Sequence, residues 1–265
     1  MRRLKLTVEF DGTDFHGFQV QTKTGERTVQ AVVQRAFAQL PGKHLPLRSA
    51  GRTDAGVHAL AHVAHIDTDT PVVTEQLQRA LNAHLPPDVR ILSVQDVPNS
   101  FEAQYSCLYR RYLYRMRFYR DDLSLNTLDR NRVLPLYRDL DVAVMQAAAT
   151  KFEGTRDFSA LATQETRSPV KTVYLCRLDA VGRDLSLHVA ADGFLRGMVR
   201  AIVGMLIRVG EGRLALENVE KILASKDRRQ AWENAPPFGL YFVEAGYEPW
   251  DGEKGRRKKE EERKG

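Results

Sequence analysis

Hydrophobic and polar residues follow a regular order of strand-like and helix-like segments along the first hundred residues. Residues 4–10 alternate as in a strand, and residues 29–40 carry apolar side chains at helical spacing, with Thr28 as a natural N-cap and Pro41 and Gly42 as a natural stop. The pattern then predicts strand, turn and strand over 47–67, a helix over 74–84 and a strand over 89–97. The predicted order is strand, helix, strand, strand, helix, strand.

A similar order of elements returns in the rest of the chain. Residues 111–118 alternate as a strand, residues 139–152 are apolar at helical spacing, and residues 171–191 read as a hairpin with its turn at 181–184. Two helices and a strand complete this half, over 194–209, 216–224 and 239–247. The halves share no close sequence repeat, so their likeness rests on element order alone.

This order predicts an α+β protein of two ferredoxin-like α/β lobes, residues 1–100 and 101–249. An antiparallel sheet with helices on one face leaves its other face open, so two such sheets joined edge to edge make one platform with a central cleft for a large ligand. Residues 251–265 are a mixed-charge run without apolar side chains. We therefore expect a disordered charged tail over residues 250–265.

The charge balance narrows the class of partner. The chain has 40 Lys and Arg against 34 Asp and Glu, a net charge of +6, and only +2 of this lies in residues 251–265 because they hold seven basic and five acidic residues. A basic groove on the folded body would suit a polyanion. Cys107 and Cys176 lack metal-type spacing, which favours a reducing cytoplasm without disulfides. No segment is apolar over enough residues to cross a bilayer.

One short segment carries the strongest chemical signal, Gly51-Arg52-Thr53-Asp54-Ala55-Gly56-Val57-His58-Ala59. If it is extended, Arg52 and Asp54 project to the same side, and the flanking glycines permit close backbone approach. A nearby guanidinium favours the ionised carboxylate, which is a competent nucleophile or base. The same residues also suit an ordinary turn with an ordinary ion pair, and local physics leaves both interpretations open.

An aromatic and basic segment follows the predicted lobe boundary. It interleaves five tyrosines with five arginines, namely Tyr105, Tyr109, Tyr112, Tyr114 and Tyr119 with Arg110, Arg111, Arg115, Arg117 and Arg120. Arginines neutralise phosphates, and each base stacked on an aromatic ring contributes about 1–3 kcal/mol. The pattern favours contact with nucleic acid, although plain cross-strand pairs would give it too.

Three other groups are weaker candidates. Residues 10–21 form a glycine-punctuated aromatic loop that reads equally as a packed connection. Arg196 and Arg200 lie four residues apart on one helical face, where they could reach a polyanion, support a buried aspartate or form a solvated stripe. Three histidines have spacings of four and three, but they lie in a turn and strand region without a completing ligand, which disfavours metal: His58, His62 and His65.

At these residues the chain closely resembles the tRNA pseudouridine synthase A family. The resemblance covers residues 4–249 and is most specific over residues 51–59. Supporting matches lie, in order, at Phe10-Asp-Gly-Thr-Asp-Phe15, Asn82-Ala-His-Leu-Pro86, Arg111-Tyr112-Leu-Tyr114, Arg167-Ser168-Pro169, Met198-Val-Arg200-Ala-Ile-Val-Gly204 and Ala235-Pro-Pro-Phe-Gly239-Leu240-Tyr241. Five positions depart from the usual pattern: Phe18, His62, Glu102, Gln104 and Gly197.

The resemblance implies roles for individual residues. Asp54 is the catalytic nucleophile, Tyr112 stacks on the target base, Arg52 helps to turn the base out and pairs with Asp54, Arg200 supports the aspartate, and Leu240 lines the pocket floor. Six residues are expected to contact RNA: Phe101, Tyr105, Arg110, Arg111, Arg167 and Arg196. The resemblance also implies a homodimer without cofactor or metal that modifies uridines 38, 39 and 40 of the tRNA anticodon arm.

The implied reaction breaks the C1′–N1 glycosidic bond, rotates the uracil and rejoins it through C5. The base must leave its stack, and water must be kept from the glycosyl intermediate, so we expect apolar walls of Val57, Phe194, Leu195 and Leu240. Two other functions would use the same residues differently. A non-catalytic RNA clamp or tRNA folding helper would be indifferent to Asp54, and a histidine-centred metallohydrolase would be sensitive to a chelator.

Overall fold

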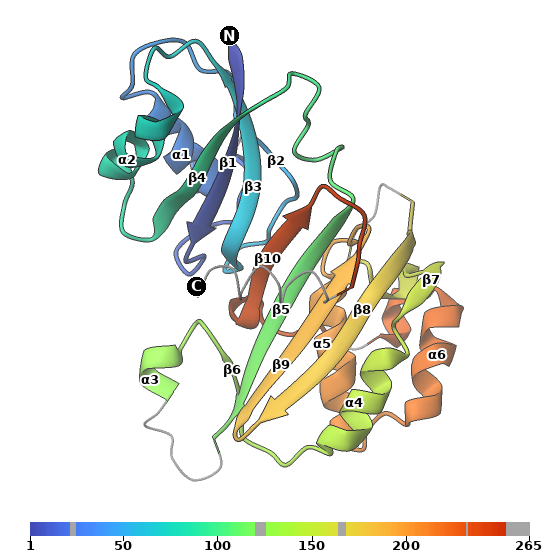
Figure 1. Ribbon diagram of the computed structural model, residues 1–265. Coiled ribbons are helices and arrows are strands. Elements are labelled where there is room, and N and C mark those ends of the chain that lie inside the picture. Colours follow the sequence, from blue (N-terminus) through green and yellow to red (C-terminus); the bar gives the residue numbers. More distant parts are fainter. Residues whose placement is uncertain (22–24, 120–125, 164–167, 232, 253–265) are drawn as a thin grey trace.

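The computed structural model describes residues 1–21, 25–119, 126–163, 168–231 and 233–252. Their strands form one ten-stranded sheet in the order β4-β1-β3-β10-β5-β9-β8-β7, with β2 paired to β3 and β6 paired to β5 (Figure 1). The protein is therefore a mixed α/β structure built on one large sheet. Among the described residues, no helix combines the length and the apolar character that crossing a membrane requires.

The N-terminal half follows the predicted order. Its elements are β1 (Arg2–Phe10), α1 (Val29–Phe37), β2 (Arg48–Ser49), β3 (His58–Thr68), α2 (Thr74–His84) and β4 (Val89–Val97). The Thr28 side chain accepts a hydrogen bond from the Ala31 N–H, which confirms the expected N-cap of α1. Strand β1 pairs antiparallel with β3 on one side and with β4 on the other, and these strands with α1 and α2 form the upper part of Figure 1.

The C-terminal half contains the predicted hairpin and helices together with some unpredicted elements. Its elements are β5 (Tyr109–Phe118), α3 (Asn126–Asp129), β6 (Leu134–Leu136), α4 (Val142–Thr150), β7 (Gly154–Asp157), β8 (Val170–Val181), β9 (Asp184–Ala191), α5 (Met198–Gly210), α6 (Leu216–Ser225) and β10 (Leu240–Gly246). Short 3-10 turns lie at Ser159–Leu161, Arg228–Gln230 and Pro237–Gly239. The short elements α3, β6 and β7 carry too few residues to show a periodicity, which is why the pattern did not predict them.

Helix α5 begins four residues later than its apolar pattern predicts. Gly197, its N-cap, has φ of +78°, a left-handed conformation that side chains other than glycine rarely adopt. Residues 192–197 therefore form a loop between β9 and α5. Most of α5 is buried and it packs against α4, which explains why the most apolar stretch of the chain is a core helix (Figure 1).

Strand β10 joins the two halves. It is the last strand in sequence, yet it lies in the middle of the sheet, antiparallel to β5 and parallel to β3 (Figure 1). Tyr241 pairs with His58 and Phe242 with Ala59. The main strands within each half pair antiparallel, whereas the join between the halves is parallel, a feature that the sequence pattern did not address. The joined platform itself is present, as expected.

The final described residues pack on the sheet. The Trp250 ring stacks on Tyr174 with 6.0 Å between centroids and meets the edge of Tyr109 at 4.9 Å. Residues 253–265, the larger part of the expected charged tail, lie outside the described residues.

The fold predicts that Phe242 is a principal stabilising residue at the join. Its side chain is fully buried in β10, and its ring lies 5.2 Å from Tyr112 and 4.6 Å from His62 between centroids. Replacing Phe242 with Ala should lower the free energy of unfolding by about 3–5 kcal/mol, because it removes a buried ring and leaves a cavity. Urea denaturation measures this, and Val181→Ala, at a 77% exposed position, should change stability by less than about 0.5 kcal/mol. Equal effects of the two substitutions would contradict this view of the join.

Candidate functional site

Asp54 lies in a loop between β2 and β3 that the aromatic loop after β1 holds in place. The Phe18 N–H donates to the Thr53 carbonyl at 3.2 Å, and the Gly56 N–H donates to the Phe15 carbonyl at 3.2 Å. Within the turn, the Val57 N–H donates to the Asp54 carbonyl at 3.3 Å. The backbone on both sides of Asp54 is therefore fixed before β3 begins.

Glycines in the aromatic loop allow this close approach. A Cβ on Gly17 would lie 2.6 Å from the Thr53 carbonyl oxygen, and Gly17 has φ of +93°. A Cβ on Gly12 would lie 2.0 Å from the Val57 carbonyl oxygen. Both contacts are shorter than a carbon can tolerate, so the glycines are needed to seat the Asp54 loop. The loop is a packed connection, and that packing positions the candidate carboxylate.

Two arginines meet the Asp54 carboxylate, Arg196 from the loop before α5 and Arg200 from the first turn of α5. Arg200 Nη1 donates to Asp54 Oδ2 at 3.3 Å, and Arg196 Nε lies 3.7 Å from Asp54 Oδ1. The Asp54 side chain is 31% exposed. It is thus paired with cations and still open to a ligand.

Arg200 is itself held by backbone. Its Nε donates to the Ala235 carbonyl at 2.6 Å, and its own carbonyl accepts from the Ala235 N–H at 3.0 Å. These bonds tie α5 to the segment that leads into β10. These hydrogen bonds therefore fix the position from which the Arg200 guanidinium reaches Asp54.

Arg52 does not make the predicted pair. It is exposed, and the described residues include no ion pair between Arg52 and Asp54. The prediction assumed an extended segment, but β2 ends at Ser49 and residues 52–54 belong to a loop, so side chains do not alternate between two faces there. Arg196 and Arg200 supply the opposite charge instead.

Tyr112 and a set of apolar side chains form the buried side of the site. The Tyr112 ring meets Phe194 edge-on at 4.9 Å and Phe242 at 5.2 Å between centroids. Burial raises the pKa of the Tyr112 hydroxyl, the charge of Arg110 opposes this, and the charge of Asp54 acts in the same direction as burial. Of the residues expected as apolar walls, Val57, Leu195 and Leu240 are buried and Phe194 is partly buried.

Two of the residues expected to contact RNA are structural instead. All five N–H groups of Arg110 donate to backbone carbonyls. Arg111 is 2% exposed, and its Nε lies 3.6 Å from Glu244 Oε2. Because neighbouring residues of a strand face opposite ways, Arg111 also lies on the other face of the sheet from Tyr112. The sequence pattern could not separate these arginines from surface cations.

The other expected RNA contacts divide between surface and interior. Tyr105 is 79% exposed and the Arg196 side chain is 63% exposed, so both are accessible. Phe101 is partly buried, with its ring 4.8 Å from that of Tyr247 and the Lys5 amine 5.7 Å from its centroid, which makes it a packing residue. Arg167 lies outside the described residues.

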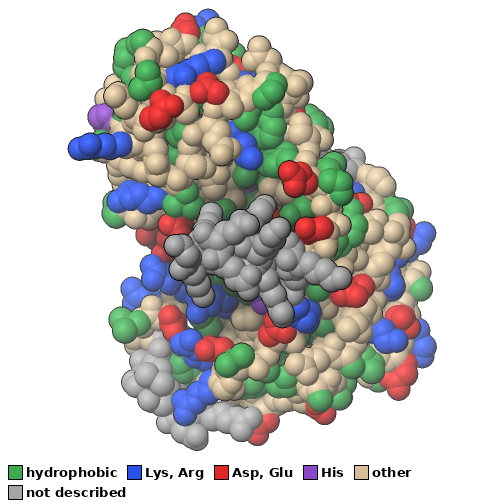
Figure 2. Space-filling view, in the orientation of Figure 1, with side chains coloured by type: hydrophobic (Ala, Val, Ile, Leu, Met, Phe, Trp, Pro, Cys, Tyr) green, Lys and Arg blue, Asp and Glu red, His purple; other side chains and the backbone are tan. Residues whose placement is uncertain are grey.

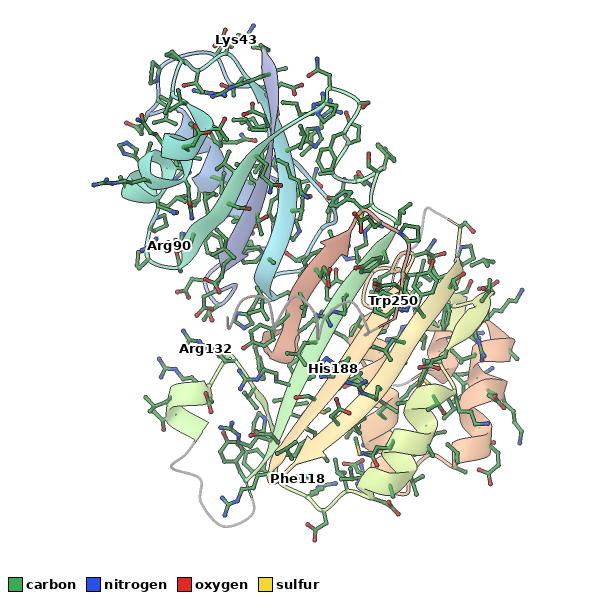
Figure 3. All side chains as sticks on the ribbon, in the orientation of Figure 1. Lys43, Arg90, Phe118, Arg132, His188 and Trp250 are labelled. Atoms are coloured by element: carbon green, nitrogen blue, oxygen red, sulfur yellow. The ribbon has the colours of Figure 1, made fainter. Side chains whose placement is uncertain are left out.

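Basic side chains also border the gap between the two halves. Figure 2 shows Lys and Arg side chains beside Asp and Glu side chains at the indentation between the upper and lower parts of the molecule, and a pocket between the N-terminal loops and α3 is lined by Asp11, Asp14 and Asp88 as well as by Arg130 and Arg132. In Figure 3, Arg90 at the end of the N-terminal half and Arg132 beside α3 lie on opposite sides of it. Arg132 Nη2 donates to Asp11 Oδ2 at 2.8 Å, and the Asn131 carbonyl lies 2.6 Å from His58 Nε2. The unpredicted segment around α3 is thereby anchored to the loops near Asp54.

The three spaced histidines have separate environments. His58 Nδ1 accepts from the Gly12 N–H at 3.0 Å, and His65 Nδ1 accepts from the Ala103 N–H at 3.1 Å. His62 Nε2 lies 3.0 Å from the Gly51 carbonyl. In the part of the chain that the structure describes, no cluster of three or more His, Cys, Asp or Glu could hold a metal ion.

Two of the unusual positions contact one another beneath the Asp54 loop. The His62 and Phe18 rings stack with 4.3 Å between centroids and 18° between planes. His62 is fully buried, and burial lowers the pKa of its imidazole to about 4. The neutral ring can therefore donate its Nε2–H to the Gly51 carbonyl, three residues before Asp54. No sequence signal linked these two positions.

Comparison with known proteins gives consistent matches over most of the chain. A family model described as tRNA pseudouridine synthase matches residues 6–106 and 148–248. The tRNA pseudouridine synthase A of Parvibaculum lavamentivorans is 41% identical over 251 residues, which cover 94% of this chain and 100% of the relative. That of Lysinibacillus sphaericus is 40% identical over 257 residues, covering 93% and 100%. An archaeal box H/ACA sRNP Nop10-Cbf5 complex aligns with a TM-score of only 0.35 at 16% identity, over 77% of this chain and 44% of that chain, a likeness too weak to carry an argument.

The environment of His62 predicts a pH-dependent stability. Below pH 6.5 the unfolded chain protonates this histidine, whereas the folded chain keeps it neutral down to about pH 4, so stability falls as the pH falls through this window. The His62 contribution should amount to about 2 kcal/mol between pH 7 and pH 5. His62→Gln, which can still donate to the Gly51 carbonyl, should lose this part of the pH dependence in denaturant unfolding. The exposed His84→Gln should keep it, and identical pH profiles for wild type and His62→Gln would refute the assignment.

Proposed function

Given that this chain belongs to the tRNA pseudouridine synthase A family and isomerises uridine to pseudouridine in tRNA, we propose that the Asp54 carboxylate is its catalytic group. One observation carries the proposal. Asp54 is a partly exposed carboxylate that lies against Arg196 and Arg200 and within electrostatic reach of the buried Tyr112. A nucleophile or base needs this combination of negative charge and access.

The reaction asks the carboxylate to act at the sugar or at the base. The C1′–N1 bond breaks, a C1′–C5 bond forms, and the hydrogen that C5 loses is balanced by the proton that N1 gains. Asp54 can attack C1′, attack the base, or take a sugar proton on the way to a glycal, and its surroundings suit all three routes. In each, Arg200 keeps the carboxylate oriented through the 3.3 Å contact between Nη1 and Oδ2.

The buried side of the site would receive the base. Turning a uridine out of its base stack costs a few kcal/mol of free energy. Stacking of the base on an aromatic side chain can offset this cost. We assign this stacking role to Tyr112, whose ring is fixed between Phe194 and Phe242. Leu240 forms the pocket floor, and with Val57 and Leu195 it limits water near the glycosyl intermediate.

The tRNA would lie along the basic indentation between the halves. We propose that the anticodon arm binds there, with uridines 38, 39 and 40 as targets, and that Arg52, Tyr105, Arg167 and Arg196 contact the RNA. Arg52 and Tyr105 are exposed, which supports this role. A homodimer that grips one tRNA across both subunits completes the proposal, and it follows from the family resemblance.

The proposed architecture is a pair of ferredoxin-like halves, residues 1–100 and 101–249. Two spatial strand orders support it, β4-β1-β3-β2 in the first half and β10-β5-β9-β8 in the second. When the short strands β6 and β7 are left out, each order places the first and third strands of a half side by side in the middle. The proposed location is the cytoplasm, and Cys107 and Cys176 are both free and buried.

The first test of the proposal removes only the charge of Asp54. Asp54→Asn has nearly the same shape, so it should bind tRNA normally and lose pseudouridine formation by on the order of 10³-fold or more. Binding is measured by filter retention, and product by a pseudouridine-specific chemical stop that also maps the modified positions. Asp179→Asn, on the exposed part of β8, is the matched control and should stay active. Full activity of Asp54→Asn would remove Asp54 from its role and favour an RNA clamp.

The second test concerns exclusion of water. Leu240→Ala enlarges the apolar floor of the pocket, so it should lower turnover or release free uracil through abortive hydrolysis while tRNA still binds. Chromatography of the reaction mixture separates uracil from modified RNA. An unchanged yield of pseudouridine without free uracil would count against Leu240 as part of the pocket.

A further inference from the structure

Arg110 connects the three chain segments that meet at the candidate active site. Its Nε and Nη2 donate to the Ala50 carbonyl at 3.2 and 2.9 Å. Its Nη1 donates to the carbonyls of Asp192 and Cys107 at 3.0 and 3.3 Å, and Nη2 also donates to that of Gln104 at 2.8 Å. A guanidinium has five N–H groups, and all five are used.

Two of these carbonyls, those of Ala50 and Asp192, belong to residues that lie close in sequence to a residue of the site. Ala50 is four residues before Asp54, and Asp192 is two residues before Phe194 at the start of the loop that carries Arg196. Arg110 itself is two residues before Tyr112 on β5, so the two side chains share one face of that strand. One side chain thus links the segments that present the carboxylate, its cations and the base-stacking ring.

The linked segments are anchored at their far sides. The Ala50 N–H donates to the Val63 carbonyl of β3 at 2.8 Å, and the Asp192 N–H donates to the Thr172 carbonyl of β8 at 3.1 Å. Arg110 therefore bridges from the N-terminal part of the sheet to the C-terminal part on the side where Tyr112 lies. Because one rigid guanidinium bonds to the carbonyls of both Ala50 and Asp192, it holds these two segments at a fixed separation.

We propose that Arg110 is a positioning residue of this enzyme, which sets the distance between the Asp54 loop and the loop that leads into α5. The inference rests on the proposed role of Asp54 and extends it to a residue that touches no substrate. Lysine cannot replace it, because an ammonium has three donors and lacks the planar fork that reaches carbonyls on opposite sides. A loss of about 1 Å in the placement of a catalytic group lowers a rate by about 100-fold.

The test compares turnover with affinity in two variants. Arg110→Ala and Arg110→Lys should each lower kcat by about 100-fold, while the Kd for tRNA and its salt dependence stay as in the wild type, since no N–H of Arg110 is left for phosphate. Methylguanidinium added to the medium should raise kcat of Arg110→Ala, whose cavity admits it, and leave Arg110→Lys unchanged. Arg177→Ala on the exposed part of β8 is the control and should match the wild type.

Several results would overturn the proposal. An unchanged kcat would show that the bridge is dispensable. A weaker Kd with a salt slope reduced by about one would make Arg110 an RNA contact. Loss of the folded state in both variants, seen by circular dichroism, would give it a general structural role. Asp54→Asn measured in the same assay separates this proposal from the previous one, because an active Asp54→Asn with a rescued Arg110→Ala would leave the positioning role intact around a different catalytic group.

Discussion

A short parallel pairing between β3 and β10 is the constraint on which the rest of the structure depends. Only Tyr241 with His58 and Phe242 with Ala59 form this ladder, yet it turns two sets of strands into one sheet. Parallel pairs are slightly less stable per residue than antiparallel ones, so the buried Phe242 and its ring contacts add the apolar burial that the ladder itself lacks. The Asp54 loop precedes β3, and Tyr112 lies on the strand next to β10, so this join brings the carboxylate to the ring.

The site itself is a compromise between charge and access. A carboxylate buried without a partner would take up a proton, and one in open water would be a weaker nucleophile. Arg200 reaches Asp54 from α5, where its Nε is held by the Ala235 carbonyl, and Arg196 approaches from a more exposed position. Tyr112 and Leu240 are both buried. The carboxylate is therefore paired with cations and still partly exposed.

Much of the local structure could be predicted from periodicity and caps. The strand and helix order of the N-terminal half, the cap at Thr28, the hairpin at 181–184 and the longer elements of the C-terminal half were predicted correctly, whereas α3, β6 and β7 were not. The errors occurred at residues whose role depends on tertiary contacts that the local sequence pattern does not indicate. Arg110 and Arg111 look like surface cations in a tyrosine-rich strand, but one bonds to backbone carbonyls and the other faces the opposite side of the sheet.

The sequence by itself determined the elements and singled out Asp54, because periodicity records which face of a segment is buried and a nine-residue motif keeps its residues together in space. The tertiary structure decided which cations meet the carboxylate, since Arg196 and Arg200 lie more than 140 residues away in sequence and reach it only when α5 packs beside the Asp54 loop. It also decided that His62 stacks on Phe18 and that β10 lies between β3 and β5. Such contacts depend on how segments that are distant in sequence pack against one another, and the local sequence around each residue does not indicate that packing.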